Sequence, residues 1–270
     1  MSDDLDPSRL APRPLPRADV SISPIIWELS HLDLSPQLLS AASAAGANWF
    51  FIPESVAHDE LERAATLLAE LSLIIGIDTQ QLLSRRSTPL EQRLAALRLS
   101  RCEAVMLQHA EITELKAGRP FHRLNQLRDS GRTRLAFVEA ADAADAEWII
   151  ESSPAHAVSV PYGLRDQLVT YRAFKAAAEM GTALFARRTR HALWSVDQAD
   201  DADVSFRAGE AAITSIIEPL PRDSAQLQHT LGAVARPMPD EERERWWAQF
   251  QAAVPAPPKP PRGHPPEYGT

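Results

Sequence analysis

Charged and polar side chains stand directly after several short apolar segments of this 270-residue chain. If those segments are parallel strands, their last residues meet at one edge of the sheet, where binding and catalytic groups gather. Both signs of charge occur there, which predicts a pocket for a polar small molecule, with Arg187 or Arg188 holding an anionic group. Alternatively, strand ends are polar only because the chain reaches the protein surface there. The residues concerned are Glu28, Glu54, Asp78, Gln108, His109, Glu139, Tyr162, Arg187, Arg188 and Glu218.

His109 is the best single candidate for chemistry, because an imidazole at a strand end can transfer a proton or donate a hydrogen bond to a carbonyl. It could equally cap the following helix or face solvent. Asp78 and Glu139, with Glu28 or Glu218, could bind a hard cation, but no HxH or HExxH spacing supports a metal, and none is expected.

Composition excludes several classes of protein. The formal charge of −8 and the pI near 5.5 argue against binding to duplex DNA or an anionic membrane. The single cysteine, Cys102, excludes an internal disulfide and a CxxC zinc site, and its place before a strand suggests a structural role. No apolar run approaches the roughly 18 residues of a membrane span, and residues 1–14 lack a signal core. We expect a cytoplasmic protein without membrane insertion.

Short apolar segments alternate with amphipathic ones along the chain. Ser35-Pro36 and Thr88-Pro89 are typical helix starts, while Gly46 and Gly181 are typical helix ends. Repeated strand–helix units predict a parallel sheet, and eight of them in about 220 residues favour a closed (β/α)8 barrel. The ten glycines form no GxGxxG or Walker loop. The expected strands cover residues 21–29, 48–52, 71–77, 104–108, 133–139, 156–162, 182–186 and 211–217.

The two ends of the chain differ from its middle. Four prolines among charged residues in 1–19 exclude a continuous helix or a central strand, so we expect a flexible arm there. Residues 254–270 hold seven prolines and are expected to be an extended, solvated tail. A ligand for a proline-recognising groove is the alternative for this tail. Residues 20–253 would then be one barrel domain.

Four segments in order resemble the aldo-keto reductase superfamily. LEQRLAALRLSRCEAVMLQHAE (90–111) resembles its helix, turn and fourth strand, and FHRLNQLRDSGRTRLAFVEAAD (121–142) its next helix–strand unit. AFKAAAEMGTALFAR (173–187) and AAITSIIEPLPRDSAQLQHTLGAVARPMPDEE (211–242) resemble its last two units. The resemblance implies an eight-stranded barrel, NADPH as hydride donor, and carbonyl reduction by an Asp-Tyr-Lys-His tetrad.

The tetrad positions that the resemblance assigns hold other residues. The Asp and Tyr positions fall on Ile52 and Ala57, and the Lys position on Asp78 or Gln80. No tyrosine precedes Tyr162 and no lysine precedes Lys116. The His position falls on Gln108, so His109 is one residue late and enters the pocket only if a bulge intervenes.

The cofactor end is altered as well. The glycine of the family's phosphate loop corresponds to Glu218 or Pro219, where a carboxylate repels phosphate and a proline lacks the donor N–H. Arg222 and Gln226 match positions that contact the cofactor in this family, and Phe185 is the candidate for stacking on the cofactor. The family's adenine-binding pair corresponds to His229-Thr230.

Three hypotheses follow. The first is a barrel with a degenerate tetrad, a pseudoenzyme that needs no cofactor and binds a protein partner or a small polar ligand at its mouth. The second is an NADPH-dependent oxidoreductase in which His109 polarises a carbonyl and Arg187 or Arg188 holds an anionic substrate. The third is lyase or isomerase chemistry by Glu139 and Asp78.

Overall fold

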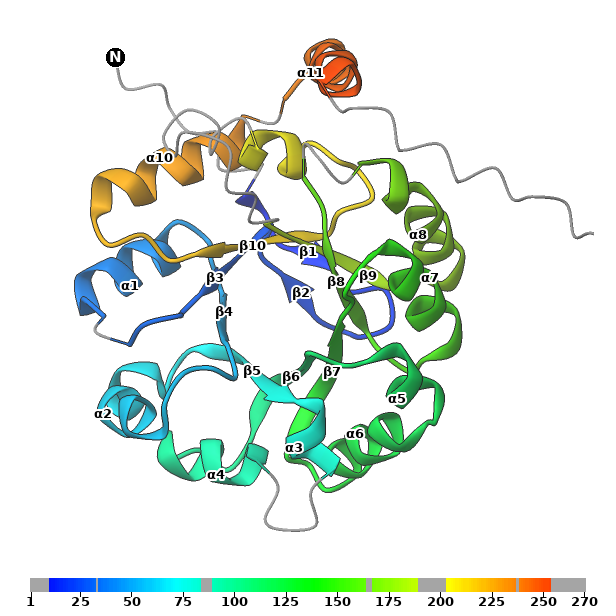
Figure 1. Ribbon diagram of the computed structural model, residues 1–270. Coiled ribbons are helices and arrows are strands. Elements are labelled where there is room, and N and C mark those ends of the chain that lie inside the picture. Colours follow the sequence, from blue (N-terminus) through cyan, green and yellow to red (C-terminus); the bar gives the residue numbers. More distant parts are fainter. Residues whose placement is uncertain are drawn as a thin grey trace, which may run out of the picture.

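Eight parallel strands close into a barrel in the computed structural model, which describes residues 10–32, 34–83, 89–163, 167–188, 203–236 and 238–253. Their order around the barrel is β10-β3-β4-β5-β6-β7-β8-β9 (Figure 1). The (β/α)8 fold expected from the sequence is thereby confirmed. The strands are β3 (Ile25–Glu28), β4 (Trp49–Ile52), β5 (Ser72–Asp78), β6 (Cys102–Gln108), β7 (Thr133–Glu139), β8 (Ala157–Pro161), β9 (Ala183–Arg187) and β10 (Ser215–Pro219).

Helices form a ring outside the strands (Figure 1). The Ser35 hydroxyl accepts a hydrogen bond from the Leu38 backbone N–H, so α1 begins as predicted. Gly181 has φ +64° directly after α8, the conformation that favours glycine at a helix end. The helices are α1 (Pro36–Ala44), α2 (His58–Leu68), α3 (Thr79–Leu83), α4 (Pro89–Ala96), α5 (Ile112–Lys116), α6 (Arg119–Asp129), α7 (Ala143–Ser152), α8 (Gln167–Met180), 203–208, α10 (Ser224–Ala235) and α11 (Asp240–Ala253).

Each strand divides its side chains between two apolar layers. Phe51, Met106 and Phe137 belong to the cluster inside the barrel, whereas Ile52 and Leu107 belong to the cluster between strands and helices. Because side chains alternate along a strand, these layers fix which strand-end residues face the mouth. The inward positions at the carboxyl ends are Glu28, Pro53, Asp78, Gln108, Glu139, Pro161, Arg187 and Pro219.

A hairpin closes the opposite end of the barrel. Its strands are β1 (Arg13–Pro14) and β2 (Ser21–Ile22), and Leu15 and Ile22 are buried in the inner cluster. Arg13 Nη1 donates to the Ile213 carbonyl at 2.7 Å, and Arg17 Nη1 to the Ala155 carbonyl at 2.9 Å. A flexible arm was expected over residues 1–19; residues 10–19 belong to this hairpin, and residues 1–9 lie outside the described part of the chain. The prolines exclude a helix or central strand, but they leave a two-residue antiparallel pair possible.

The last barrel strand begins later than the sequence suggested. Strand structure was expected over 211–217 but is found at Ser215–Pro219. Residues 211–214 form a turn in which the Glu210 carboxylate accepts from the Ala212 N–H at 3.2 Å and the Glu210 carbonyl from the Ile213 N–H at 3.0 Å. These hydrogen bonds compete with strand pairing, as acidic side chains often do in turns.

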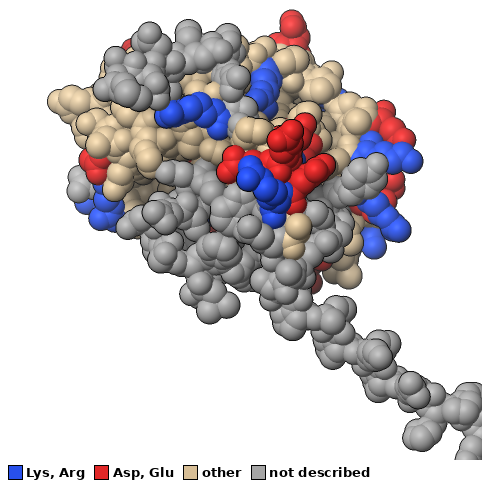
Figure 2. Space-filling view, turned by 90° about the horizontal axis from the view of Figure 1, so that it is seen from above, with Lys and Arg blue, Asp and Glu red and all other residues tan. Residues whose placement is uncertain are grey.

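Helix α11 lies outside the ring of helices (Figure 1). Its Arg243 pairs with Glu210, Nη2 to Oε2 at 2.5 Å, and its guanidinium lies 5.0 Å from the centre of the Phe206 ring. Charged side chains of both signs gather on this side of the molecule, seen from above in Figure 2. The residues expected to form the proline-rich tail, 254–270, lie outside the described part of the chain. Within that part, no helix is both long and apolar enough to span a membrane.

We expect Leu15→Ala to lower the free energy of unfolding by about 2–5 kcal/mol, because it leaves a cavity where the hairpin closes the barrel. Denaturant unfolding measures this change. Met180→Ala, at an exposed position on α8, is the control and should shift the free energy by less than about 0.5 kcal/mol. Equal changes in the free energy of unfolding for the two substitutions would contradict the role of Leu15 in closing the barrel.

Candidate functional site at the carboxyl ends of the strands

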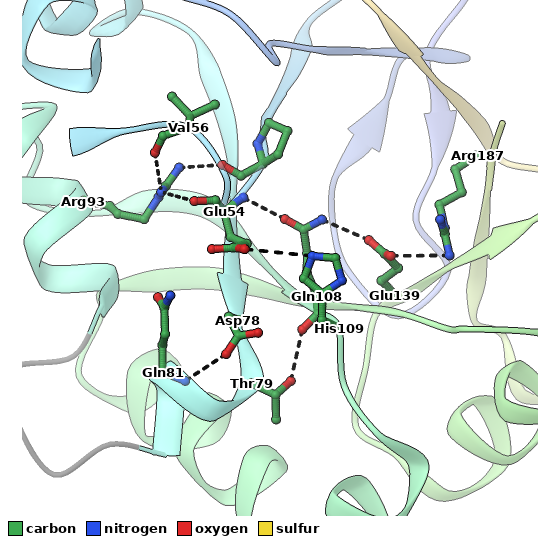
Figure 3. Close-up of polar contacts among 11 residues, drawn as sticks. Glu54, Val56, Asp78, Thr79, Gln81, Arg93, Gln108, His109, Glu139 and Arg187 are labelled. Carbon is green, nitrogen blue, oxygen red and sulfur yellow. Dashed lines mark hydrogen bonds and ion pairs between the residues drawn. The ribbon is translucent and has the colours of Figure 1, made fainter. Parts of the chain in front are cut away.

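A chain of hydrogen bonds crosses the mouth of the barrel (Figure 3). The Glu54 backbone N–H donates to Gln108 Oε1 at 2.8 Å, and Gln108 Nε2 donates to Glu139 Oε2 at 3.0 Å. The other oxygen of Glu139, Oε1, lies 3.3 Å from Arg187 Nη2, which also donates to the Ala140 carbonyl at 3.1 Å. Gln108, Glu139 and Arg187 were predicted site residues, and the structure brings them together from β6, β7 and β9.

Gly76 in β5 makes room for this network. A Cβ atom at Gly76 would overlap Gln108 Oε1 and lie 2.8 Å from the Glu54 backbone nitrogen. Any side chain there would displace the Gln108 amide from its place between β4 and β7. Gly76 was not among the predicted site residues, although a glycine inside a buried apolar strand is a recognised signal for close approach of another group.

His109 lies at the rim and does not point into the barrel. Gln108 takes the inward position, as strand alternation predicted, and His109 has φ +53°, which is uncommon for a residue with a side chain. Its ring is 61% exposed, and Nε2 lies 3.9 Å from Glu54 Oε1 (Figure 3). The left-handed turn thus brings the imidazole beside Glu54, where a molecule at the mouth could reach both.

Two further contacts hold the rim of β4 and β5. Asp78 Oδ1 accepts a hydrogen bond from the Gln81 backbone N–H at 3.0 Å, so this predicted site residue helps to start α3. Arg93 of α4 donates to the carbonyls of Pro53 at 2.7 Å and Glu54 at 3.0 Å. Sequence reasoning missed Arg93, because nothing in an amphipathic helix indicates that an arginine will bind a distant loop.

Tyr162 was predicted at the mouth, but its side chain lies outside the barrel, between the strands and the helices. Pro161 takes the inward position, so Tyr162 turns outward into a buried cluster beside Phe174 and Phe206, with ring centres 5.1 and 5.5 Å away. Its hydroxyl donates to Glu210 Oε2 at 3.3 Å. Burial, with the negative charge of Glu210, raises the pKa of Tyr162 above its usual range. A tyrosine so held is a poor proton donor.

Glu218 also turns outward. It pairs with Arg207, whose Nε lies 3.0 Å from Asp203 Oδ2, and both Arg207 and Glu218 are buried between β10 and residues 203–208. The pair compensates two charges that would otherwise be costly to bury. The prediction that Glu218 belongs to the ring at the mouth is therefore wrong.

The predicted cofactor contacts lie in two separate places. Phe185 is fully buried inside the barrel, edge-on to Phe137 at 5.1 Å, one inward position below Arg187. Arg222 and Gln226 are exposed at the start of α10, where the Gln226 N–H donates to Asp223 Oδ1 at 2.8 Å. Arg188 is half-buried directly after β9.

No group of three or more His, Cys, Asp or Glu side chains in the described ranges could hold a metal ion. Cys102 is buried at the start of β6, at the end of the barrel away from the mouth, with Sγ 3.8 Å from the Arg132 carbonyl. Burial raises its thiol pKa to about 12.

No protein-family model matches this sequence, and no curated protein does. Solved structures do match. The holo form of aldo-keto reductase AKR11C1 from Bacillus halodurans has a TM-score of 0.73 at 12% identity, covering 91% of this chain and 98% of that one. The thermostable aldo-keto reductase Tm1743 in complex with epalrestat has a TM-score of 0.70 at 15% identity, covering 88% and 99%.

A third match is an aldo/keto reductase from Klebsiella pneumoniae in complex with NADP and acetate. Its TM-score is 0.69 at 12% identity, covering 89% of this chain and 94% of that one. At such identities the likeness concerns the fold alone. The chain has the barrel fold of the aldo-keto reductases, as its resemblance to that superfamily implied.

Gly76→Ala should lower the free energy of unfolding by about 1–3 kcal/mol, because its Cβ displaces the Gln108 amide. In a Gln108→Ala background one of the two close contacts is gone, so the same substitution should cost less. A double-mutant cycle by denaturant unfolding measures this coupling. Strictly additive effects would show that Gly76 and Gln108 do not interact.

The folded protein should react slowly with a disulfide reagent such as 5,5′-dithiobis(2-nitrobenzoic acid) at pH 8. With its pKa raised to about 12, the buried Cys102 remains a protonated thiol there, and only the thiolate attacks. Unfolding in guanidinium should release the single thiol of the chain. Rapid labelling of the folded protein would instead identify an accessible cysteine.

Proposed function

We propose that this chain is a reductase-like barrel that acts by binding a small polar ligand or a protein partner at its mouth, without carbonyl reduction and without NADPH. The network of Gln108, Glu139 and Arg187 carries this proposal. It occupies the centre of the mouth with an amide, a carboxylate and a guanidinium. None of these groups donates a proton readily to a carbonyl oxygen at neutral pH.

The distribution of tyrosine and lysine supports the same conclusion. Among described side chains, Tyr162 is held outside the barrel by Glu210. Lys116 Nζ lies 5.6 Å from the centre of the Trp148 ring, and Lys175 pairs with Glu179 along α8 at 3.8 Å. A tyrosine–lysine pair that could protonate a substrate is therefore missing from the described part of the mouth. General acid catalysis contributes about 10²–10⁴-fold to rates.

NADPH fits this mouth poorly. Pro219 stands at the inward end of β10 and lacks a backbone N–H for a phosphate. Four described carboxylates lie at the strand ends (Glu28, Glu54, Asp78 and Glu139), against the three guanidinium groups of Arg93, Arg187 and Arg188, so a phosphate group would meet a net negative charge. Arg222 and Gln226 are exposed at the start of α10 and remain the best candidates for holding a phosphate.

One observation favours the alternative of an oxidoreductase with a remodelled site. The His109 ring lies next to Glu54 at the rim, and a histidine–carboxylate pair is a common acid–base arrangement. In this alternative His109 polarises the carbonyl and Arg187 holds an anionic substrate. Lyase or isomerase chemistry has less support, because Asp78 caps α3 and both oxygens of Glu139 are engaged.

We expect no saturable binding of NADPH to the purified protein at concentrations up to about 1 mM, which corresponds to a standard free energy near −4 kcal/mol. Fluorescence or calorimetry at micromolar protein measures this. Saturable binding in the low micromolar range that is lost in Arg222→Ala and kept in Arg98→Ala would overturn the proposal. Arg98 is an exposed arginine at the end of α4, away from the mouth.

A further inference from the structure

The guanidinium of Arg243 joins helix α11 to the barrel. Nη1 donates to the Gly209 carbonyl at 3.0 Å, and Nη2 donates to Glu210 Oε2 at 2.5 Å and to Tyr162 Oη at 3.5 Å. The group also lies over the Phe206 ring, 5.0 Å from its centre. Because a planar guanidinium offers several donors in a fixed arrangement, this one side chain binds α11 to two segments of the barrel.

Tyr162 connects this contact to the mouth. Its side chain is buried, and its hydroxyl donates to Glu210 Oε2 at 3.3 Å. Its backbone N–H donates to the Arg187 carbonyl at 3.2 Å, one step beyond Pro161 and Arg187, the last register pair of β8 and β9. Strand ends open more readily than strand centres, so the anchored side chain of Tyr162 restrains the ends of both strands.

Arg187 belongs to the network that crosses the mouth. Its Nη2 lies 3.3 Å from Glu139 Oε1 and donates to the Ala140 carbonyl at 3.1 Å. These contacts join its side chain to β7, and the hydrogen bond from Tyr162 joins its backbone to the end of β8. A continuous series of contacts therefore runs from α11 through Glu210 and Tyr162 to Arg187.

We propose that Arg243 is a positioning residue for the mouth. It holds the Tyr162 hydroxyl, directly and through Glu210, and Tyr162 holds the end of β9 that carries Arg187. Release of α11 loosens the guanidinium that pairs with Glu139, so the C-terminal helix controls a group on the inner side of the barrel wall. This coupling concerns the position of Arg187 whatever the mouth binds, so NADPH binding would overturn the proposed function and leave the coupling intact.

The Nε–H of Arg187 reports on this position. Its nitrogen is buried and has no hydrogen-bond partner among the residues that the structure describes, so its proton exchanges with water only when the side chain moves. Its proton–nitrogen NMR signal is assigned by its loss in Arg187→Lys, because lysine has no Nε–H. Arg128 Nε, on α6, is buried in the same way and reports on the rest of the fold.

Arg243→Gln in the full chain should speed proton exchange at Arg187 Nε by about threefold to tenfold, as expected for residues in one contact network. Exchange at Arg128 should not change. The matched control is Arg245→Gln, because Arg245 is exposed on the same helix and its Nε donates to the Glu241 carbonyl within that helix at 3.4 Å; it should change neither signal. Unchanged exchange at Arg187 in Arg243→Gln would overturn the proposal. Equal acceleration at Arg187 and Arg128 would also overturn it, because it indicates loosening of the whole fold.

A second variant tests the route of the coupling. Tyr162→Phe keeps the ring and removes the hydroxyl that Glu210 and Arg243 hold, so it should also speed exchange at Arg187. In the Tyr162→Phe background, Arg243→Gln should speed exchange by a smaller factor than it does alone, because the hydroxyl through which it acts is gone. Equal factors in the two backgrounds would overturn the route through Tyr162.

Discussion

The side-chain amide of Gln108 is the interaction on which the mouth depends. Its oxygen accepts the Glu54 N–H and its nitrogen donates to Glu139, so one planar group joins the end of β4 to the end of β7. An amide is suited to this place because it offers an acceptor and a donor at fixed geometry without a charge. The position of Glu139, and through it that of Arg187, follows from this link.

The same link supports the binding function proposed for the barrel. A polar network in which most donors and acceptors are paired is rigid, although Arg187 Nε has no hydrogen-bond partner among the described residues. The aldo-keto reductases share the fold, but a fold supports many functions, which depend on the residues at the strand ends. Here those residues include an amide, a carboxylate and a guanidinium that contact one another across the mouth.

Much of the architecture could be predicted from the sequence, because it depends on local patterns. Residues close together in the sequence determine the buried strands, the helix start at Ser35-Pro36 and the helix end at Gly181. Strand alternation even predicted that Gln108, and not His109, would face inward. Tyr162 and Glu218 were misplaced because they are the last polar residues of their segments, yet strand alternation turns both side chains outward.

Other features could not be predicted because their causes lie far away in the chain. The space beside Gly76 is filled by Gln108, and the hairpin at the closed end is held by carbonyl groups that follow it by more than a hundred residues. Such contacts form only in the assembled barrel, and no periodic pattern in the sequence predicts them.

The hairpin also has a consequence for how the protein is made. Arg13 binds the carbonyl of Ile213, 200 residues later, and β3 pairs with β10. A ribosome adding roughly 5–20 residues per second needs about 10–40 seconds to reach these partners. During that interval the hairpin has no completed surface to fold against. The middle units of the nascent chain can assemble early, but the barrel closes only after β10 has been made.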